Sequence, residues 1–199
     1  MKGISRKMLY VITGGSGSGK SEYAEKLAVH IRKEYFDSGK LYYAAAMYPQ
    51  DEECRQRIKR HRSMRQGKGF LTRECYTGIE RLSVEKKDVV LLECMSNLLA
   101  NEMYLEEGRI KSRGGEVCEQ LQEAILRPVL ELSRRAGCLV VVTNEVFSDG
   151  RRYEQETQLY LELLGNINRC LAQKAEGVVE VVYTIPVWVK GEKLCEDQS

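Results

Sequence analysis

The sequence predicts an α/β fold, in which a mostly parallel sheet has helices on both faces and a short strand pair closes the C-terminus. Several short runs are apolar at every position, which is typical of strands buried on both faces. Segments with apolar residues at helical spacing alternate with these runs. The chain has 199 residues and no internal repeat, so we expect one domain over residues 1–199.

Each element follows from a local pattern. The expected strands are residues 8–13, 41–46, 70–75, 88–94, 138–146, 178–185 and 187–190. The expected helices are residues 21–33, 51–65, a segment after 94 that runs to 104, 117–135 and 153–175. The helix at 51–65 has its acidic residues first and its basic residues last, which suits the helix dipole, and Gly67 and Gly69 end it. Pro128 should bend or divide the helix at 117–135, and residues 106–116 look most like a linker.

Composition excludes several classes of protein. The net charge is +2, too small for a nucleic-acid binder. No apolar run reaches the roughly 20 residues of a membrane span, and the N-terminus lacks a signal-peptide pattern. The seven cysteines form no CxxC pair, which argues against a zinc site or a disulfide framework. We therefore expect a cytoplasmic protein whose cysteines are mostly buried apolar residues.

A glycine-rich loop follows the first expected strand. Residues 14–21 match the P-loop pattern G-x-x-x-x-G-K-[ST], with a strand before and a helix after. Glycines let backbone N–H groups turn toward phosphate oxygens, Lys20 would neutralise the β- and γ-phosphates, and Ser21 would hold Mg²⁺. The sequence thus predicts a P-loop NTPase. Its expected nucleotide-binding residues are Gly14, Gly15, Ser16, Gly17, Ser18, Gly19, Lys20 and Ser21.

A second metal ligand should stand at the end of a neighbouring strand, because ligands of open α/β sheets bind at the carboxyl ends of strands. Glu93 closes DVVLLE, and Glu145 closes CLVVVTNE. Either carboxylate could complete the site, whereas Asp88 stands at the wrong end of its strand.

One of the two histidines lies in a basic segment. RIKRHRSMR, residues 57–65, surrounds His61 with five cations: Arg57, Lys59, Arg60, Arg62 and Arg65. These cations would attract phosphate and lower the pKa of the imidazole, and a neutral imidazole can attack an α-phosphorus. Helical spacing should place Arg57 and Arg65 on the side of His61 more than Arg62. The alternative is a solvated basic helix face with an idle histidine.

A P-loop alone does not separate a small-molecule kinase from a GTPase switch or a DNA-handling ATPase. The set of GTPase motifs is missing, since no lysine and aspartate complete a guanine-reading motif after Asn144, and the net charge of +2 argues against the ATPase. Two further alternatives stay open. One is a monofunctional small-molecule kinase in which His61 is idle, and the other is a nucleotide-dependent regulatory or binding protein.

The motifs, in their order, resemble the bifunctional adenosylcobinamide kinase / adenosylcobinamide-phosphate guanylyltransferase family of cobalamin biosynthesis. They are TGGSGSGKS (13–21), YYAAA (42–46), DEECRQRIKRHRSMR (51–65), LTRE (71–74), VVLLEC (89–94), VVVTNEV (140–146) and LLGNINRCLA (163–172). The resemblance implies a RecA-like P-loop sheet, a homotrimer, GTP (or ATP) with Mg²⁺, and a corrinoid substrate. It implies that adenosylcobinamide is phosphorylated first. GMP then passes from GTP through His61 to adenosylcobinamide phosphate, giving adenosylcobinamide-GDP and pyrophosphate.

The same resemblance assigns individual residues. His61, Lys20 and Glu93 would be catalytic, with Glu93 acting on the metal and the transferred phosphate. Ala44, Ala45 and Ala46 would end a strand beside the glycine loop and lie along the nucleotide. Arg62, Ser63, Met64 and Arg65 would contact GTP, and Glu74 would lie near the guanosine.

The chain departs from the family pattern in two places. After Val146 the family usually has two glycines and then Val-Pro, whereas this chain reads FSDGRR over residues 147–152. After Arg65 it has Gly67-Lys68-Gly69, where the family more often has proline. The first change would alter the corrinoid site or remove one of the two activities.

Overall fold

A computed structural model describes residues 8–111, 116–145 and 155–194. Its strands are β1 (Met8–Thr13), β2 (Leu41–Ala45), β3 (Phe70–Glu74), β4 (Val89–Glu93), β5 (Cys138–Val142), β6 (Gly177–Val182) and β7 (Ile185–Lys190). Its α-helices are α1 (Lys20–Tyr35), α2 (Glu52–Met64), α3 (Met95–Tyr104), α4 (Val117–Leu121), α5 (Arg127–Arg135) and α6 (Gln155–Lys174). A 3-10 turn, η1 (Ile79–Arg81), and a π-helical segment, η2 (Gln122–Leu126), complete the described elements. Every expected helix and strand is present, within a few residues of its expected ends.

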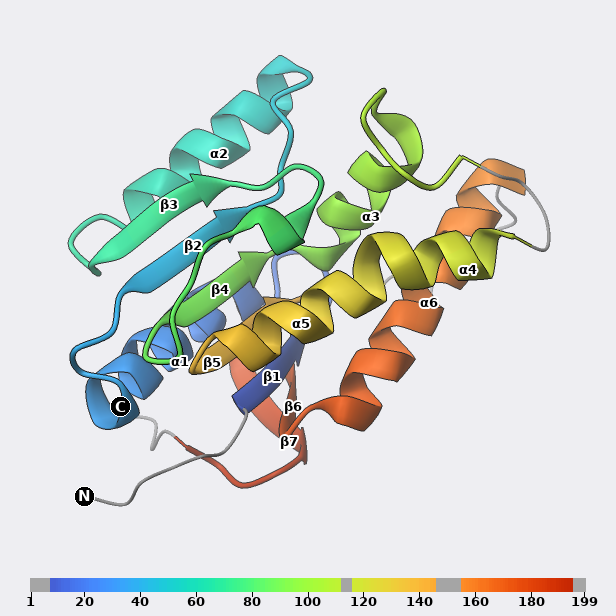
Figure 1. Cartoon of the computed structure of the whole chain (residues 1–199). Helices are drawn as coiled ribbons and strands as arrows, with labels where there is room; N and C mark the ends of the chain where they lie inside the picture. The colour runs from blue at the N-terminus through green and yellow to red at the C-terminus, as the bar shows by residue number, and fades with distance from the viewer. Residues whose placement is uncertain (1–7, 112–115, 146–154, 195–199) are drawn as a thin grey trace.

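The seven strands form one sheet in the order β3-β2-β4-β5-β1-β6-β7 (Figure 1). All neighbouring pairs are parallel except β6 and β7, which are antiparallel. The predicted mostly parallel sheet with a C-terminal strand pair is confirmed. Only the division of that pair differs, because β6 ends at Val182 and Tyr183-Thr184 form the turn.

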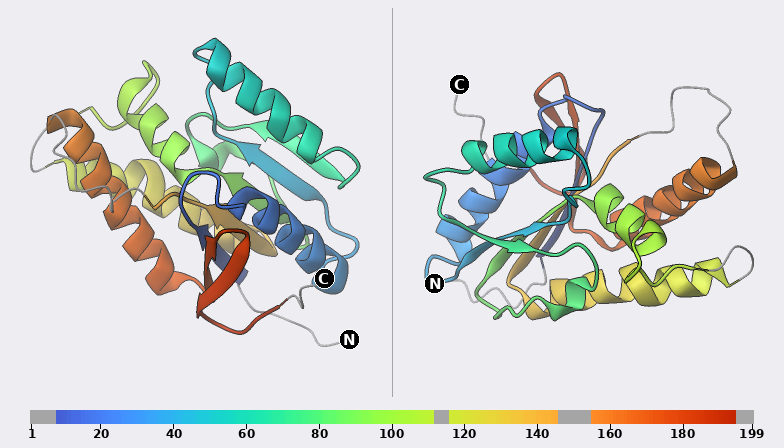
Figure 2. Two further views of the ribbon diagram at one scale, coloured as in Figure 1. Left: turned by 180° about the vertical axis from the view of Figure 1, so that it is seen from behind. Right: turned by 90° about the horizontal axis from the view of Figure 1, so that it is seen from above.

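Helices cover both faces of the sheet, as predicted (Figure 2). On one face α1 packs on the alternate strand residues that include Tyr10 and Ile12. On the other face α3, the α4–η2–α5 segment and α6 pack on the residues in between, among them Leu9 and Val11. Successive residues of a strand point to opposite faces, so strands that are apolar throughout supply both cores.

Helix α2 differs from the others because none of its residues is buried. It lies on the same side of the sheet as α1, next to β2 and β3 (Figure 2). Its start is capped by Asp51, whose carboxylate accepts a hydrogen bond from the Cys54 N–H (2.7 Å). Gly67 and Gly69, with φ of 79° and 80°, make the turn that follows it. Helix α2 therefore lies over the sheet without joining the apolar core.

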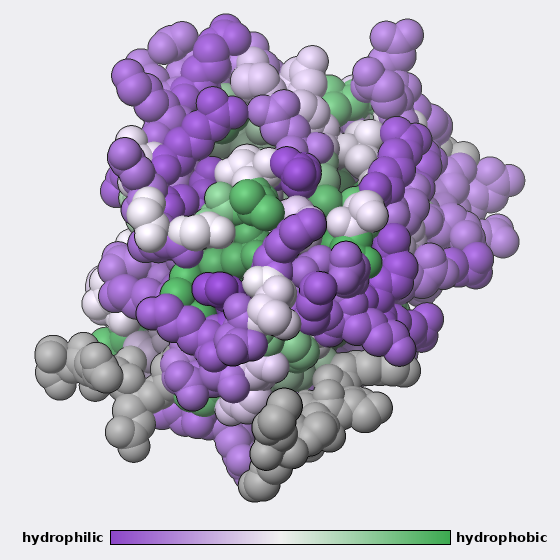
Figure 3. Space-filling model, turned by 60° about the vertical axis from the view of Figure 1, so that its left-hand side comes forward, coloured by the Kyte–Doolittle hydropathy of each residue, from purple (hydrophilic) through white to green (hydrophobic). Residues whose placement is uncertain are grey.

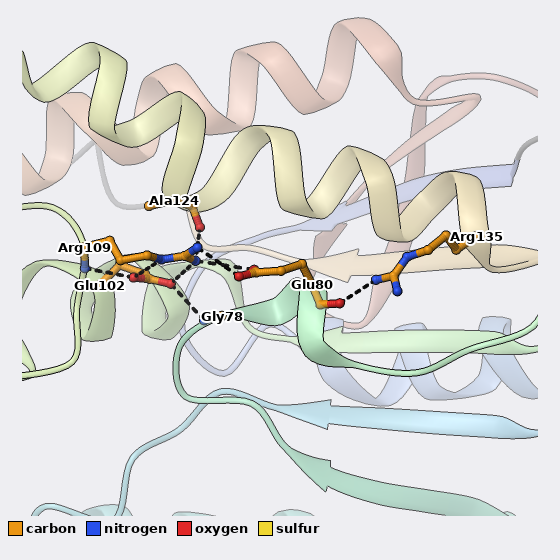
Figure 4. A network of polar contacts seen from close by, with 6 residues as sticks. All are labelled: Gly78, Glu80, Glu102, Arg109, Ala124 and Arg135. Carbon is orange, nitrogen blue, oxygen red and sulfur yellow. Dashed lines mark hydrogen bonds and ion pairs between the residues drawn. The ribbon is translucent and has the colours of Figure 1, made fainter.

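Pro128 disturbs the helix one turn before its own position. It has no N–H to donate to the carbonyl of Ala124, and the helix widens there into η2, with the Arg127 N–H bonded to the Gln122 carbonyl. The Arg109 guanidinium donates to the Ala124 carbonyl instead (2.6 Å; Figure 4). The expectation of a linker over 106–116 is therefore wrong for Arg109, which ties this segment to the helix. Residues 112–115 lie outside the described part.

Two further expectations concern cysteines and membranes. Cys94 and Cys138 are buried, whereas Cys54, Cys75 and Cys170 are half-buried, and all five have free thiols. The expectation that most cysteines are buried is therefore wrong for these five described residues. Within the described residues, no helix has both the length and the apolar character that crossing a bilayer would require.

Candidate active site

The P-loop follows β1 and leads into α1, as the motif predicts. Gly17 and Gly19 have φ of 72° and 91°, the left-handed backbone that glycine adopts without strain. The Lys20 ammonium donates to the Gly15 carbonyl (2.9 Å), and the Ser21 hydroxyl donates to Glu93 Oε1 (2.6 Å). Burial lowers the pKa of Lys20. The loop thus holds a cation and a hydroxyl next to the end of β4.

Glu93 is the carboxylate that meets the P-loop. It is the last residue of β4 and 7% exposed, and burial raises its pKa to about 7. Its second oxygen, Oε2, is buried without a hydrogen-bond partner among the described residues. Glu145 lies beyond the end of β5, where its backbone N–H approaches the Gly14 carbonyl at 3.4 Å. Of the two predicted metal ligands, Glu93 is the one that the structure brings to Ser21.

A pocket of about 340 Å³ lies between α2 and the α1-covered face of the sheet. The sheet contributes Tyr43, Ala45, Thr72, Glu74 and Glu93. The helix and its C-cap contribute Ile58, His61, Arg62 and Arg65. The strand register brings these residues together on the pocket floor, because Ala45 pairs with Glu74 of β3 on one side and with Glu93 of β4 on the other. Figure 3 shows the side of the molecule that lies at the left in Figure 1, where apolar side chains gather in a recess bordered by hydrophilic ones.

His61 and Glu93 line this same pocket. The imidazole is half-buried, and burial lowers its pKa, with further lowering by Arg65, Arg57, Arg60 and Lys20 in that order. The first two arginines are those that helical spacing places on its side. Arg62 instead pairs with Glu74 across the pocket (3.2 Å). Burial and the surrounding cations therefore both favour the unprotonated form of the imidazole.

Arg65 is the most deeply placed cation of the pocket. It is 6% exposed, and its Cζ lies 3.4 Å from the centroid of the Tyr43 ring, a cation–π contact. Its Nε and Nη1 are buried without hydrogen-bond partners among the described residues. Buried guanidinium donors without partners are costly, and an anion would satisfy them. The structure thus offers two directed donors beside His61.

The alanines at the end of β2 divide between two faces. Ala45 lines the pocket, whereas Ala44 and Ala46 are buried in the core on the other face. The expectation that this strand lies beside the glycine loop is wrong, because β4 and β5 separate β2 from β1. Of these two strands, β4 ends in Glu93, which connects the sheet to the glycine loop by accepting the hydrogen bond from Ser21.

Two of the expected nucleotide contacts do not line the pocket that His61 lines. Ser63 is exposed and lines a shallower depression together with Gly67 and Gly69. Met64 is half-buried at the end of α2. In the same turn the Lys68 ammonium donates to Glu25 of α1, a fully buried carboxylate (2.7 Å). The departure at 67–69 thus supplies an ion pair between α1 and the turn after α2. The departure at 147–152 lies outside the described residues.

Two residues of α3 that the sequence does not single out bond to the segment after β3, in which Tyr76 lines the pocket. The Asn101 amide donates to the Ala46 carbonyl (2.7 Å) and the Tyr76 carbonyl (2.9 Å). Glu102, which is fully buried, accepts from the Gly78 N–H (3.0 Å) and from the Arg109 guanidinium (2.6 Å; Figure 4). No sequence signal separates them from the other polar residues of α3, among them Ser96 and Asn97.

The chain is similar to curated proteins over most of its length. The family model described as cobinamide kinase / cobinamide phosphate guanyltransferase matches residues 10–189. The bifunctional adenosylcobalamin biosynthesis protein CobU of Escherichia coli (strain K12) is 30% identical over 193 residues, covering 92% of this chain and 100% of that protein. CobU of Salmonella typhimurium (strain LT2) is 28% identical, with 92% and 100% covered.

A third relative and a solved structure extend these comparisons. The bifunctional adenosylcobalamin biosynthesis protein CobP of Pseudomonas aeruginosa (strain PAO1) is 27% identical, with 92% of this chain and 98% of that protein covered. Among solved structures, the flagellar accessory protein FlaH from Methanocaldococcus jannaschii gives a TM-score of 0.47 at 12% identity, covering 94% of this chain and 79% of that chain. Because the family model matches nearly the whole chain, this P-loop protein belongs to the cobinamide kinase / cobinamide phosphate guanylyltransferase family of enzymes.

Proposed function

We propose that this chain phosphorylates adenosylcobinamide and transfers GMP from GTP, through a guanylylated His61, to adenosylcobinamide phosphate. One observation carries the proposal. His61 and Glu93 line one pocket, and Glu93 accepts a hydrogen bond from Ser21 of the P-loop at 2.6 Å. A histidine and a phosphate loop are thus connected through a single carboxylate. The names of the relatives, which describe bifunctional proteins of adenosylcobalamin biosynthesis, support the same function.

The kinase step uses the P-loop. Backbone N–H groups of the loop and Lys20 would hold the triphosphate of ATP or GTP. The substrate hydroxyl attacks the γ-phosphorus and loses its proton to water. An O–P bond forms, and the bond to the β-bridging oxygen breaks to release the nucleoside diphosphate. The Lys20 ammonium, which now bonds to the Gly15 carbonyl, would exchange this partner for phosphate oxygens. The kinase therefore depends on Lys20.

The residues of this site fit Mg²⁺. The ion prefers oxygen ligands, and it is usually held by one or two protein groups together with phosphates and water. Ser21 Oγ and the unpartnered Oε2 of Glu93 are two such groups. Bound there, the ion would neutralise charge on the β- and γ-phosphates. Glu93 and Ser21 would keep it at the junction between the loop and the pocket.

The transferase step uses His61. An unprotonated ring nitrogen attacks the α-phosphorus of GTP, an N–P bond forms, and the bond to pyrophosphate breaks. The phosphate of adenosylcobinamide phosphate then attacks the same phosphorus, and the imidazole leaves. The lowered pKa of His61 keeps the imidazole unprotonated at neutral pH. The imidazole is therefore ready to react without a separate base.

Arg65 and Glu74 would place the guanylyl group. The two unpartnered donors of Arg65 are available to phosphate oxygens, which gain charge in the transition state. Glu74 lies on the pocket floor and could accept from the N–H groups of guanine, a hydrogen-bond pattern that adenine lacks. Its present partner is Arg62, at 3.2 Å. A contact between guanine and Glu74 would give the transferase step a basis for preferring GTP.

A homotrimer is part of the proposal. The edge strand β7 leaves three alternate apolar residues open to solvent: Ile185 (65% exposed), Val187 (47%) and Val189 (64%). An exposed apolar edge strand readily pairs with another chain. This surface supports an assembly of copies of the chain.

Two labels on GTP test the proposal. Purified protein is incubated with adenosylcobinamide, Mg²⁺ and GTP labelled at either the α- or the γ-phosphate, and products are separated. Wild type should transfer both labels to the corrinoid. His61→Asn should transfer the γ-label alone. Lys20→Ala should transfer no γ-label. Its transferase step is tested separately by supplying adenosylcobinamide phosphate as the substrate.

Other outcomes separate the alternatives. Transfer of the γ-label alone by wild type means a monofunctional kinase with an idle His61. Transfer of neither label, together with retained nucleotide binding, means a regulatory or binding protein. Transfer of α-label by His61→Asn contradicts the histidine route.

A further inference from the structure

The turn between β6 and β7 has an unusual backbone for its residues. Val182 pairs with Ile185, so Tyr183 and Thr184 form a two-residue hairpin turn. Both have positive φ, 49° and 69°. Such turns normally use Asn or Gly, because a side chain, and a β-branched one above all, is disfavoured in the left-handed region. Strained turn residues of this kind persist only where their surroundings hold them in place.

The P-loop supplies those surroundings. The Thr184 N–H donates to the carbonyl of Ser18, in the middle of the loop (2.8 Å). A Cβ placed on Gly19 would lie 3.0 Å from Thr184 Cγ2, and one on Gly14 would lie 2.5 Å from the Val181 carbonyl oxygen. The turn and the loop are therefore packed directly on each other. Thr184 faces the loop, and Tyr183 directly precedes it in the chain.

Tyr183 is the most exposed large apolar side chain in the described part of the protein, at 88%. An aromatic ring so open to water, on a strained backbone, has no role in packing. The two views of Figure 2 show the β6–β7 hairpin beside the start of α1, where the P-loop lies. The ring is thus attached at the rim of the phosphate site.

The direction of a bound nucleotide follows from the sheet order. Ser21 and Glu93 would hold Mg²⁺ and the terminal phosphates on the β4 side of β1, where the pocket opens. The hairpin lies on the opposite side of β1, since the order is β4-β5-β1-β6-β7. A nucleotide whose γ-phosphate points toward the pocket must extend its nucleoside away from it. That direction leads to the β6–β7 turn.

We propose that the ring of Tyr183 stacks on the base of the nucleotide held by the P-loop. Every nucleobase has an aromatic face, so a stacking platform binds ATP and GTP alike. Thr184 fixes the platform, because its N–H bonds to Ser18 and its hydroxyl donates to the Tyr183 carbonyl (2.6 Å). This inference rests on nucleotide binding by the P-loop. It adds a base-binding residue to the kinase site, separate from the guanine contact proposed at Glu74.

Inorganic tripolyphosphate isolates the contribution of the base, because it has the phosphates but no nucleoside. Calorimetry gives Kd for ATP, GTP and tripolyphosphate with Mg²⁺. In Tyr183→Ala, binding of ATP and of GTP should weaken about 10-fold, the size expected for loss of one base–aromatic stack, and tripolyphosphate binding should not change. Tyr183→Phe, which keeps the ring, should bind like wild type. Tyr104→Ala removes another exposed tyrosine, 56% exposed on α3, as the matched control.

The outcomes are distinct. An equal loss for all three ligands in Tyr183→Ala means that the loop itself is disturbed, and it overturns the stacking role. No loss for any ligand does the same. Wild type that binds none of the ligands contradicts the nucleotide-binding part of the proposed function as well. Thermal unfolding and light scattering of each variant establish that fold and assembly are unchanged.

Discussion

Glu93 should make the protein less stable as the pH rises. Burial raises the pKa of this carboxyl from its ordinary 4.5 to about 7, so the folded chain binds a proton that the unfolded chain has already released. Stability therefore falls as pH rises between these two values. A tenfold change in proton affinity is about 1.4 kcal/mol, and the shift corresponds to a loss of about 3 kcal/mol above pH 7.

Glu93→Gln removes this loss and keeps the shape of the side chain. Its amide oxygen can still accept the hydrogen bond that Ser21 now donates to Glu93 Oε1. Without nucleotide or Mg²⁺, the variant should match wild type near pH 4.5. At pH 8 it should be more stable by about 3 kcal/mol, which raises Tm by roughly 6–12 °C for a chain of this size. Its kinase activity should fall, because a neutral amide oxygen is a weaker ligand of Mg²⁺ than a carboxylate.

The assay is thermal or urea unfolding of both proteins across pH 4.5 to 8. A difference in stability that does not change with pH would contradict the reasoning, as would a variant less stable than wild type at pH 8. Either result would mean that Glu93 is ionised in the folded protein at neutral pH without penalty. Its buried Oε2 would then have a partner that the structure does not contain.

Three other predictions follow. Arg109→Met leaves the Glu102 carboxylate buried without its cation and should lower the free energy of unfolding by about 3–5 kcal/mol, which lowers Tm by roughly 10 °C in calorimetry. Adding Glu102→Gln should recover part of that stability, and no recovery would refute the charge argument. Guanylylation should persist as pH falls through 6.5, because the pKa of His61 is lowered. Arg65→Gln should move the midpoint of the pH–rate profile upward, and an unmoved midpoint would contradict the effect of Arg65 on the pKa of His61. Val187→Lys on β7 should reduce the mass found by light scattering from a trimer to a monomer, whereas an unchanged mass would place the interface elsewhere.

Much of the fold is predictable because its signals are local. Apolar strands, helical spacing and the P-loop pattern each depend on residues close together in sequence, and Glu93 stands at the right end of its strand. The order of strands is not available from these patterns, which is why the sequence alone does not show that β4 and β5 lie between β2 and the strand before the loop.

The parts of the site that the sequence does not reveal depend on contacts between distant residues. In the sequence, Arg109 looks like part of a linker. Its partner, the Ala124 carbonyl, is open to it because Pro128, further along the chain, has no N–H to donate there. The basic run predicts that Arg65 meets a phosphate, but it does not predict the stacking of Arg65 on Tyr43. Tyr183 has no motif around it, and its position depends on the P-loop folding against β6.

Identification of the residue that carries GMP tests the account most directly. Wild type is incubated with α-labelled GTP and Mg²⁺ without corrinoid, digested, and analysed by mass spectrometry under neutral conditions that preserve an N–P bond. The account predicts one GMP group, labile in acid and stable in base, on His61, which lies between Arg57 and Arg65 on α2. Label on any other residue, or label that persists in His61→Asn, would contradict it.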